Sequence, residues 1–329
     1  MERQLEICLD RVVESMKNEI QVLQEVGRKE FQTHTTRIKN LYQKAIDNAR
    51  TLIHSEEKGI LITNITTLKE YIHNCIKDGE YVLDIETTGL DPFNDLIVGI
   101  CLYSPSQKPA YIPMLHTNID NTLIEGQLEV AVVKQHITHL MESEALWINH
   151  NIKFDAKFLM YRWDIKPNNM YWDTQIGAFI LNENEPTHAL KPLYAKYITK
   201  SKDKQSYKDL FEKTPFNYIP LDLAEVYGAN DGTKTYKLYQ FQKQYLRPDH
   251  ERGDFKQLYK VFREIEMALL PVLCDMELRG VEIDTAFAKE LEVKYAQTIE
   301  EQEQYLYDVI YTRFGNKVKN HVGLQALVE

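Results

Sequence analysis

Residues 81–90 of the chain read YVLDIETTGL, and this run decides the fold because it predicts a β-strand that carries two acids. Its apolar and β-branched residues favour a strand, and Gly89 predicts where the strand stops. Successive side chains on a strand point to opposite faces, so Asp84 and Glu86 project together while Ile85 turns toward the core. Two adjacent carboxylates repel each other unless a cation lies between them, and Mg²⁺ or Mn²⁺ is the simplest candidate because both prefer oxygen ligands. A lone D-x-E pattern nevertheless favours a solvated acidic strand end, so the rest of the chain must decide.

Two further acidic motifs follow in the sequence. The segment ALWINHNIKFDAKFLMYRW (145–163) begins as a short apolar strand and continues as a helix-like pattern, in which Asn151 and Asp155 are four apart and share a face. The segment AEVYGANDGTKTYKLYQ (224–240) predicts another helix, with Tyr227 and Asp231 at the same spacing. Its glycines weaken that prediction, because each costs a helix about 1 kcal/mol relative to alanine. Each motif is weak alone, but the three in this order form a strong joint signal.

These motifs resemble those of the 3′→5′ proofreading exonuclease domain of family A DNA polymerases, the DNA polymerase I family. That domain belongs to the tyrosine subtype of the DEDD exonucleases. The likeness extends to GILITNITTLKEYI (59–72), AYIPM (110–114), WDTQIGAFILNEN (172–184) and EIEMALLPVLCDMELRGVEID (264–284), and so covers roughly residues 59–290. It implies an α/β fold: a ribonuclease-H-like mixed sheet flanked by helices, here with added N-terminal and C-terminal helices.

The resemblance also implies a catalytic role for each motif residue. Hydrolysis of a phosphodiester needs an activated water and a stabilised leaving oxygen, and two divalent ions about 3.5 to 4 Å apart can serve both. By resemblance, Asp84, Glu86 and Asp231 hold one Mg²⁺ or Mn²⁺ ion, and Asp84 with Asp155 holds the second. Tyr227 orients the attacking water through its hydroxyl, since a phenol with a pKa near 10 is a poor base at neutral pH.

Five residues match family positions that touch the terminal nucleotides. They are Thr87, Leu90, Asn151, Phe154 and Phe216, with Leu90 as a wedge against a base and Phe154 in place of the more familiar tyrosine. Aromatic stacking on a base contributes about 1–3 kcal/mol and tolerates any sequence. The alternative for the leucine and the two phenylalanines is plain core packing.

Composition limits the partners and the compartment. A net charge of −10 argues against a general coat for duplex DNA, although bound cations would reverse the field locally. A basic stretch lies between the second and third motifs and is either a solvated loop or a single-strand contact; it comprises Lys191, Lys196, Lys200, Lys202, Lys204 and Lys208. The four cysteines are scattered, and no signal peptide or membrane-spanning run is found, so we expect a protein of the cytoplasm (the host cytoplasm if it is viral).

The chain divides into three predicted parts. Residues 1–58 form a helical extension, with one amphipathic helix over Leu5–Leu23 and a second near residues 33–54. This extension packs on the catalytic domain or on itself, or binds a partner. Residues 59–246 form the exonuclease domain, and residues 247–329 form a linker and the helical start of a polymerase region, with a helix from Val261 to Leu278 stopped by Gly280.

Three functions remain open from the sequence. The first is a metal-dependent 3′→5′ exonuclease that removes nucleotides from single-stranded or frayed DNA 3′ ends. The second is an RNA-trimming exonuclease, and the third is a silent structural part of a split or truncated polymerase. The chain ends at Glu329, before the acidic motifs of a polymerase site, so we expect no polymerisation by this chain alone. A separate polymerase chain, if present, would dock from Glu264 onward.

Overall fold

The computed structural model describes residues 28–52, 58–201 and 207–314. The described residues up to Leu278 belong to one compact unit, and Arg279 begins a second. The helix expected over Leu5–Leu23 lies outside the described residues. The domain boundary expected near Leu246 stays a prediction.

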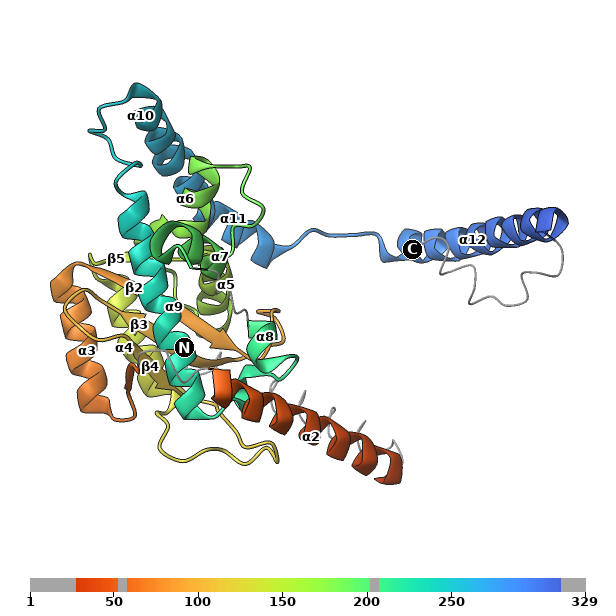
Figure 1. Ribbon diagram of the computed structural model, residues 1–329, viewed down its shortest axis with the longest axis horizontal. Coiled ribbons are helices and arrows are strands. Elements are labelled where there is room, and N and C mark those ends of the chain that lie inside the picture. The colour runs from red at the N-terminus through yellow and green to blue at the C-terminus, as the bar shows by residue number, and fades with distance from the viewer. Residues whose placement is uncertain (1–27, 53–57, 202–206, 315–329) are drawn as a thin grey trace. The chain divides into compact units, whose positions relative to one another are not determined.

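A six-stranded mixed sheet forms the centre of the first unit (Figure 1). Its order is β1-β4-β3-β2-β5-β6, and β3 runs antiparallel to both of its neighbours while the other pairs are parallel. The predicted ribonuclease-H-like α/β fold is therefore confirmed. The strands are β1 (Ile60–Leu61), β2 (Glu80–Thr87), β3 (Ile97–Tyr103), β4 (Ala110–Pro113), β5 (Leu146–Asn149) and β6 (Met170–Asp173).

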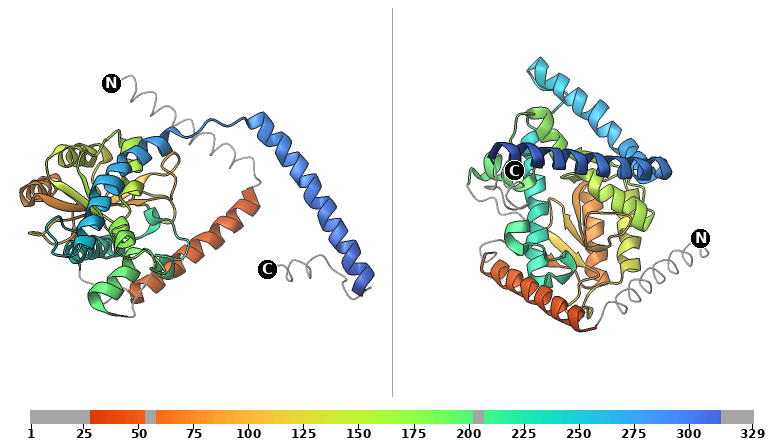
Figure 2. Two further views of the ribbon diagram at one scale, coloured as in Figure 1. Left: turned by 90° about the horizontal axis from the view of Figure 1, so that it is seen from above. Right: turned by 90° about the vertical axis from the view of Figure 1, so that its right-hand side faces the viewer.

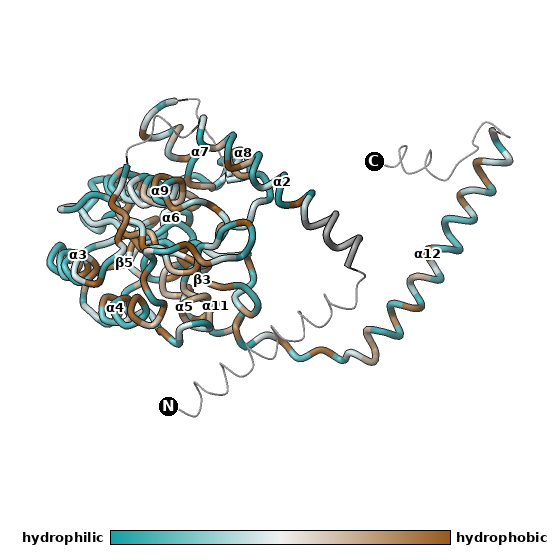
Figure 3. The backbone as a smooth tube through the Cα atoms, turned by 90° about the horizontal axis from the view of Figure 1, so that it is seen from below, coloured by the Kyte–Doolittle hydropathy of each residue, from teal (hydrophilic) through white to brown (hydrophobic). Residues whose placement is uncertain are grey.

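Helices cover both faces of this sheet. On one face, α3 (Ile65–Asp78) and α4 (Val130–Glu142) bury apolar side chains together with Leu83 and Ile85 of β2. On the other face, the long helix α9 (Leu221–Gln242) crosses the strands and contacts β3 most extensively (Figure 2). Hydrophobic residues are accordingly concentrated in the strands between these two layers (Figure 3).

Shorter helices connect these elements. They are α5 (Ile152–Trp163), α6 (Thr174–Leu181), α7 (Leu190–Tyr194), the π-helical turn η2 (Ala195–Thr199), α8 (Tyr207–Phe211) and the 3₁₀ turn η3 (Phe216–Tyr218).

The described part of the N-terminal extension, helix α2 (Arg28–Leu52), packs on the catalytic unit. This helix contacts α8 and buries Ile46 and Ala49 in a second apolar cluster beside α9. Its last turn adds an exposed ion pair between Arg50 and Asp222 at 3.3 Å, which contributes little because water screens both groups.

The helix expected from Val261 to Leu278 is present, but it begins eight residues earlier, at Gly253 in the expected linker. Helix α10 (Gly253–Lys260) continues through the π-helical turn η4 (Val261–Glu266) into α11 (Met267–Arg279), and Gly280 ends it in a left-handed conformation with φ of 71°. In the second unit, α12 (Thr285–Phe314) alternates hydrophilic and hydrophobic residues along its length (Figure 3). No helix in the described part of the chain is both long and apolar enough to cross a membrane.

Candidate active site

The acid pair lies on the central strand of the sheet. Asp84 and Glu86 follow the predicted alternation: both are half-buried on the α9 side of β2, whereas Ile85 is buried on the opposite side. Across the antiparallel pair, Asp84 is opposite Cys101 of β3.

Helix α9 brings Tyr227 and Asp231 to the acid pair, and its glycines make this close approach possible. A Cβ atom on Gly228 would lie 2.3 Å from the Cys101 sulfur, and one on Gly232 would lie 3.3 Å from Tyr103 Cβ. The glycines that weakened the helix prediction are therefore the residues that let α9 rest directly on β3. This contact places the third motif over the first.

The second motif joins the same centre through hydrogen bonds. Asp155 of α5 is only 1% exposed, and its Oδ1 accepts a hydrogen bond from the backbone N–H of Ile85 at 2.8 Å. The Nδ2 group of Asn149 donates to Asp84 Oδ1 at 3.2 Å and to Asp155 Oδ2 at 3.0 Å. Asn149 thus joins two motifs 71 positions apart, and sequence reasoning missed it. The one feature of the sequence that points to Asn149 is its position as a polar residue at the end of an apolar strand.

Asn151 is placed differently from the prediction. It precedes α5 as its N-cap residue, in a left-handed conformation with φ of 66°, and so does not share a helical face with Asp155. The buried carboxylate of Asp173 fixes this start by accepting hydrogen bonds from the N–H groups of Asn151 (3.1 Å) and Ile152 (2.8 Å). Asp173 was also missed, although it orients the helix that carries Asp155.

One lysine of the basic stretch points into the acidic centre. Lys191 of α7 is 15% exposed; its Nζ lies 3.4 Å from Asp231 Oδ2 and 3.8 Å from the centre of the Tyr227 ring. Lys234 pairs with the other oxygen of Asp231 at 3.5 Å. Lys196 instead pairs with Glu185, and Lys200 and Lys208 are exposed. The remaining two, Lys202 and Lys204, lie outside the described residues.

The carboxylates strongly perturb one another. Burial raises the pKa of Asp84 to about 7, and the charge of Asp231 adds to this shift. Burial and then the charge of Asp84 raise the pKa of both Glu86 and Asp155 well above the ordinary range. Such a centre favours either protons or bound cations, because unshielded charges in a partly buried site repel each other.

The donor set fits hard divalent ions. The carboxylates of β2, α5 and α9 lie close enough to shift one another's pKa, and carboxylate oxygens are the ligands that Mg²⁺ and Mn²⁺ prefer. Asn149 Oδ1 is also buried and has no hydrogen-bond partner among the described residues, which is consistent with an ordered water or ion beside it.

Tyr227 is held by an aromatic cluster beside these acids. Its ring contacts those of Tyr207, Phe211 and Phe216, at centroid distances of 5.7, 5.6 and 6.0 Å. Burial, followed by the charge of Asp231, raises the pKa of the Tyr227 hydroxyl well above its usual value. This shift favours the neutral, protonated form of the Tyr227 hydroxyl.

The other expected substrate contacts divide into exposed and buried residues. Leu90 is 83% exposed on the loop after β2, and the Thr87 hydroxyl donates to the carbonyl of Gly89 at 2.5 Å. Phe154 is half-buried against Phe158. Phe216 is only 4% exposed and belongs to the second apolar cluster, so the core-packing alternative describes its position in this structure.

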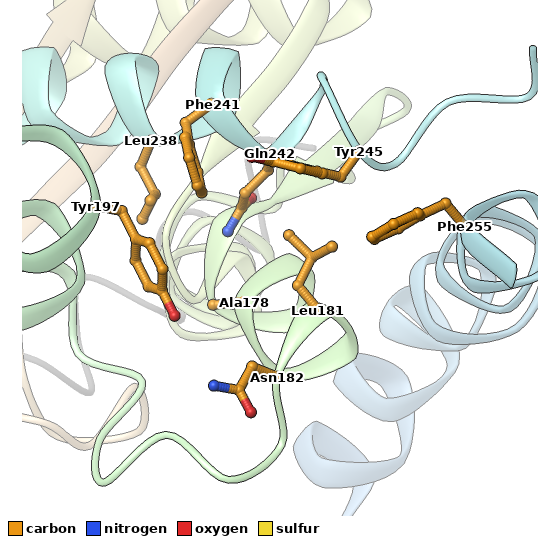
Figure 4. Close-up of a pocket in the computed structure, with 9 residues that line it drawn as sticks. All are labelled: Ala178, Leu181, Asn182, Tyr197, Leu238, Phe241, Gln242, Tyr245 and Phe255. Atoms are coloured by element: carbon orange, nitrogen blue, oxygen red, sulfur yellow. The ribbon is translucent and has the colours of Figure 1, made fainter. Parts of the chain in front are cut away.

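An apolar pocket of about 220 Å³ lies beside the C-terminal half of α9 (Figure 4). Phe241 and Tyr197 line it, together with Gln242, whose amide is already engaged by Trp172 and by the carbonyl of Thr174. None of the motif acids lines this pocket, so we assign it no catalytic part.

Comparisons with known proteins agree with this geometry. DNA polymerase I from Rhizobium leguminosarum is 26% identical over 275 residues, covering 78% of this chain and 26% of the relative. DNA polymerase I from Borreliella burgdorferi is 28% identical over 251 residues, covering 74% and 25%. The chain therefore spans about a quarter of the length of these relatives.

A solved structure supports the fold. The POL domain of Pol1 from M. smegmatis, in complex with DNA primer-template and dNTP, superposes with a TM-score of 0.52 at 12% identity, covering 79% of this chain and 39% of that one. The sequence profile of a 3′–5′ exonuclease family matches residues 60–246, which include all three motifs. The chain therefore belongs to the 3′–5′ exonuclease domain family of family A DNA polymerases.

Proposed function

We propose that this chain is a metal-dependent 3′→5′ exonuclease that removes nucleotides from DNA 3′ ends and serves proofreading. The observation that carries this proposal is the convergence of Asp84, Glu86, Asp155 and Asp231 from three elements around one centre, with Tyr227 beside them. Carboxylates held this close in a partly buried site repel one another unless a cation binds, and a silent structural module would not need such an assembly.

Each residue of the site would have a separate role in hydrolysis, set by its position. Two divalent ions, when bound, lower the pKa of the attacking water and stabilise the leaving 3′ oxygen. Asp84, Glu86 and Asp231 would hold one ion, and Asp84 with Asp155 the other. The protonated Tyr227 hydroxyl would hold the attacking water in line with the phosphorus, a positioning role that suits its raised pKa.

The 3′ end of the substrate would enter past the loop after β2. Leu90 is exposed there, where it can separate the terminal base from its neighbour, and Phe154 of α5 offers a partly exposed ring. An end that enters such a site must leave its duplex, so we expect single-stranded DNA to be degraded faster than matched duplex.

A polymerase region is the partner that fits the helix after α9. Four exposed apolar residues, Ile265, Leu269, Val272 and Met276, recur at spacings of four, three and four along η4 and α11. On the opposite side of this helix, four residues are buried: Phe262, Met267, Leu270 and Cys274. We call the exposed set the α11 stripe. Its spacing suits packing against another helix, and the relatives extend about threefold beyond the part matched here.

The test is degradation of a 5′-labelled DNA single strand with Mg²⁺. We expect a ladder that shortens from the labelled strand's 3′ end, is abolished by a chelator and by Asp84→Ala, and persists in Asp222→Asn, whose acid lies exposed in the first turn of α9. The same assay with RNA decides the substrate class. Faster degradation of RNA would favour the RNA-trimming alternative, and no ladder from the wild-type chain would overturn the proposal.

A further inference from the structure

Cys101 places a thiol inside the cluster of acids. It lies opposite Asp84 in the β2–β3 register, is 1% exposed, and its Sγ is 3.9 Å from Glu86 Oε1. One oxygen of Asp84, one oxygen of Glu86 and this sulfur all lie within 4.8 Å of one another.

The fold holds the sulfur in this position. A Cβ atom on Gly228 would lie 2.3 Å from Sγ, so the glycine lets α9 pack directly against the sulfur. The charges of Glu86, Asp84, Asp231 and Asp155, after burial, all raise the pKa of the Cys101 thiol. The thiol therefore lies among all four motif acids.

Sulfur changes the metal preference of the centre. Thiolate is a soft ligand that favours Zn²⁺ and Cd²⁺, whereas the surrounding oxygens favour Mg²⁺ and Mn²⁺. Zinc binds sulfur at about 2.3 Å and carboxylate oxygen at about 2.0–2.2 Å, so a tetrahedral ion separates the two ligand atoms by roughly 3.5 Å. The observed separation of 3.9 Å between Cys101 Sγ and Glu86 Oε1 needs only a few tenths of an ångström of adjustment.

We propose that Asp84, Glu86 and Cys101 form a binding site for a thiophilic divalent cation, Zn²⁺ or Cd²⁺, that overlaps the site of the hard catalytic ion. Binding forms a metal–sulfur bond and releases the thiol proton to solvent. An ion held in this way competes with Mg²⁺ for Asp84 and Glu86. The inference shares two acids with the proposed function but does not require hydrolysis.

The test is a titration of the full-length chain with Cd²⁺, because cadmium–thiolate bonds absorb in the ultraviolet. We expect the absorption to saturate at one Cd²⁺ per chain and to disappear in Cys101→Ser. It should persist in Cys75→Ser, whose thiol is equally buried but lies in α3 beside Gln107. Glu86→Gln, which leaves Cys101 intact, should keep the band but weaken Cd²⁺ binding by about tenfold or more, the usual scale for losing a metal-site partner.

Each outcome separates the two proposals. No absorption in the wild type, or an equal band in Cys101→Ser, overturns the thiophilic site even if the DNA ladder is present. A Cys101-dependent band without any DNA ladder supports this site and overturns the nuclease. If Cys101→Ser fails to fold, the Glu86→Gln titration decides: unchanged Cd²⁺ affinity overturns the site.

Discussion

Lys191 is the residue whose surroundings in the structure differ most from those that its sequence context predicted. In the sequence it belongs to a basic stretch that could be a solvated loop, but its ammonium group pairs with Asp231 and covers the Tyr227 ring. A divalent ion that binds Asp231 must therefore compete with this internal cation.

The consequence can be measured with Lys191→Met. Removing the competing charge should raise the affinity for Mn²⁺, by roughly threefold to tenfold if the partly buried ion pair contributes about 0.7–1.4 kcal/mol. Calorimetric titration without DNA gives this value directly. Lys196→Met is the control, because its ammonium pairs with Glu185 and not with the motif acids. Weaker Mn²⁺ binding by Lys191→Met would contradict this account of Lys191.

His116 makes stability depend on pH in a defined direction. Its Nδ1 must carry the proton, because it lies 2.8 Å from the carbonyl of Ile219, and its Nε2 therefore accepts from the Tyr111 hydroxyl at 2.5 Å. Burial lowers the pKa of His116 to about 4. The unfolded chain, with a histidine pKa near 6.5, binds a proton more readily than the folded chain. The contribution of His116 to the free energy of unfolding is therefore fully present above pH 6.5 and is lost as the pH falls toward 4.

We therefore expect His116→Gln to flatten the pH dependence of unfolding. The wild type should lose about 2 kcal/mol from this histidine between pH 7.5 and pH 5, and the variant should not. Urea unfolding at the two pH values measures the difference. His139→Gln, which changes an exposed histidine of α4, should leave the wild-type dependence intact. An unchanged slope in His116→Gln would show that this imidazole is not responsible.

At the scale of elements, the contact of α9 with β3 depends on one glycine more than on the other. A methyl group on Gly228 would overlap the Cys101 sulfur at 2.3 Å, whereas one on Gly232 would meet Tyr103 Cβ at 3.3 Å. Gly228→Ala should therefore force α9 away from the acids and cost about 1–3 kcal/mol, the usual scale for overpacking.

The matched change Gly232→Ala provides the control. Alanine favours a helix over glycine by about 1 kcal/mol, which should offset its tighter contact and leave stability near that of the wild type. Urea unfolding ranks the variants, and Mn²⁺ titration reports whether the site survives. A stable, metal-binding Gly228→Ala protein would show that close helix packing does not assemble the site.

Several helices and strands could be predicted from the sequence, because they depend on the local pattern of residues. The acid strand, the second-motif helix and the helix that Gly280 ends all follow from alternation, helical spacing and stop signals within a few residues. The start of α5 could not be predicted, because the N-cap conformation of Asn151 depends on the hydrogen bond that its N–H donates to the carboxylate of Asp173, which is 22 positions away.

The same limit applies to the site. Local motifs predicted the four acids and Tyr227, and the structure places these residues close enough to shift one another's pKa. Local motifs do not identify Asn149, Lys191 and Cys101, because each depends on a partner in another element. Asn149 contacts Asp84 and Asp155, Lys191 pairs with Asp231, and Cys101 contacts Glu86. The substrate contact of Phe216 stays a prediction, because its ring packs in the second apolar cluster of this structure and contacts the Tyr227 ring.

At the scale of the whole molecule, the α11 stripe is the surface through which we expect a polymerase region to bind. Replacing Leu269 and Val272 by glutamate places two charges in the middle of the stripe. The free energy needed to bury these charges would exceed the free energy that the contact contributes to binding. The double variant should lose association with a separately produced polymerase region at least tenfold, while its DNA ladder remains. Sedimentation of the mixed chains measures this binding.

Leu123→Glu is the control for the stripe. Leu123 is also an exposed leucine, at 60%, but it lies in the loop that follows β4. Equal association of the wild type, the control and the stripe variant would exclude this face as the docking surface.

The central claim is that acids from three distant parts of the chain form one divalent-metal centre. Calorimetric titration with Mn²⁺ tests it most directly, using the wild type, Asp231→Asn and Asp222→Asn. Both substitutions remove one charge from α9, but only Asp231 lies beside Asp84 and Glu86. We predict that Asp222→Asn binds Mn²⁺ like the wild type and that Asp231→Asn loses most of the binding. No Mn²⁺ uptake by the wild type, or equal uptake by all three proteins, would contradict the claim.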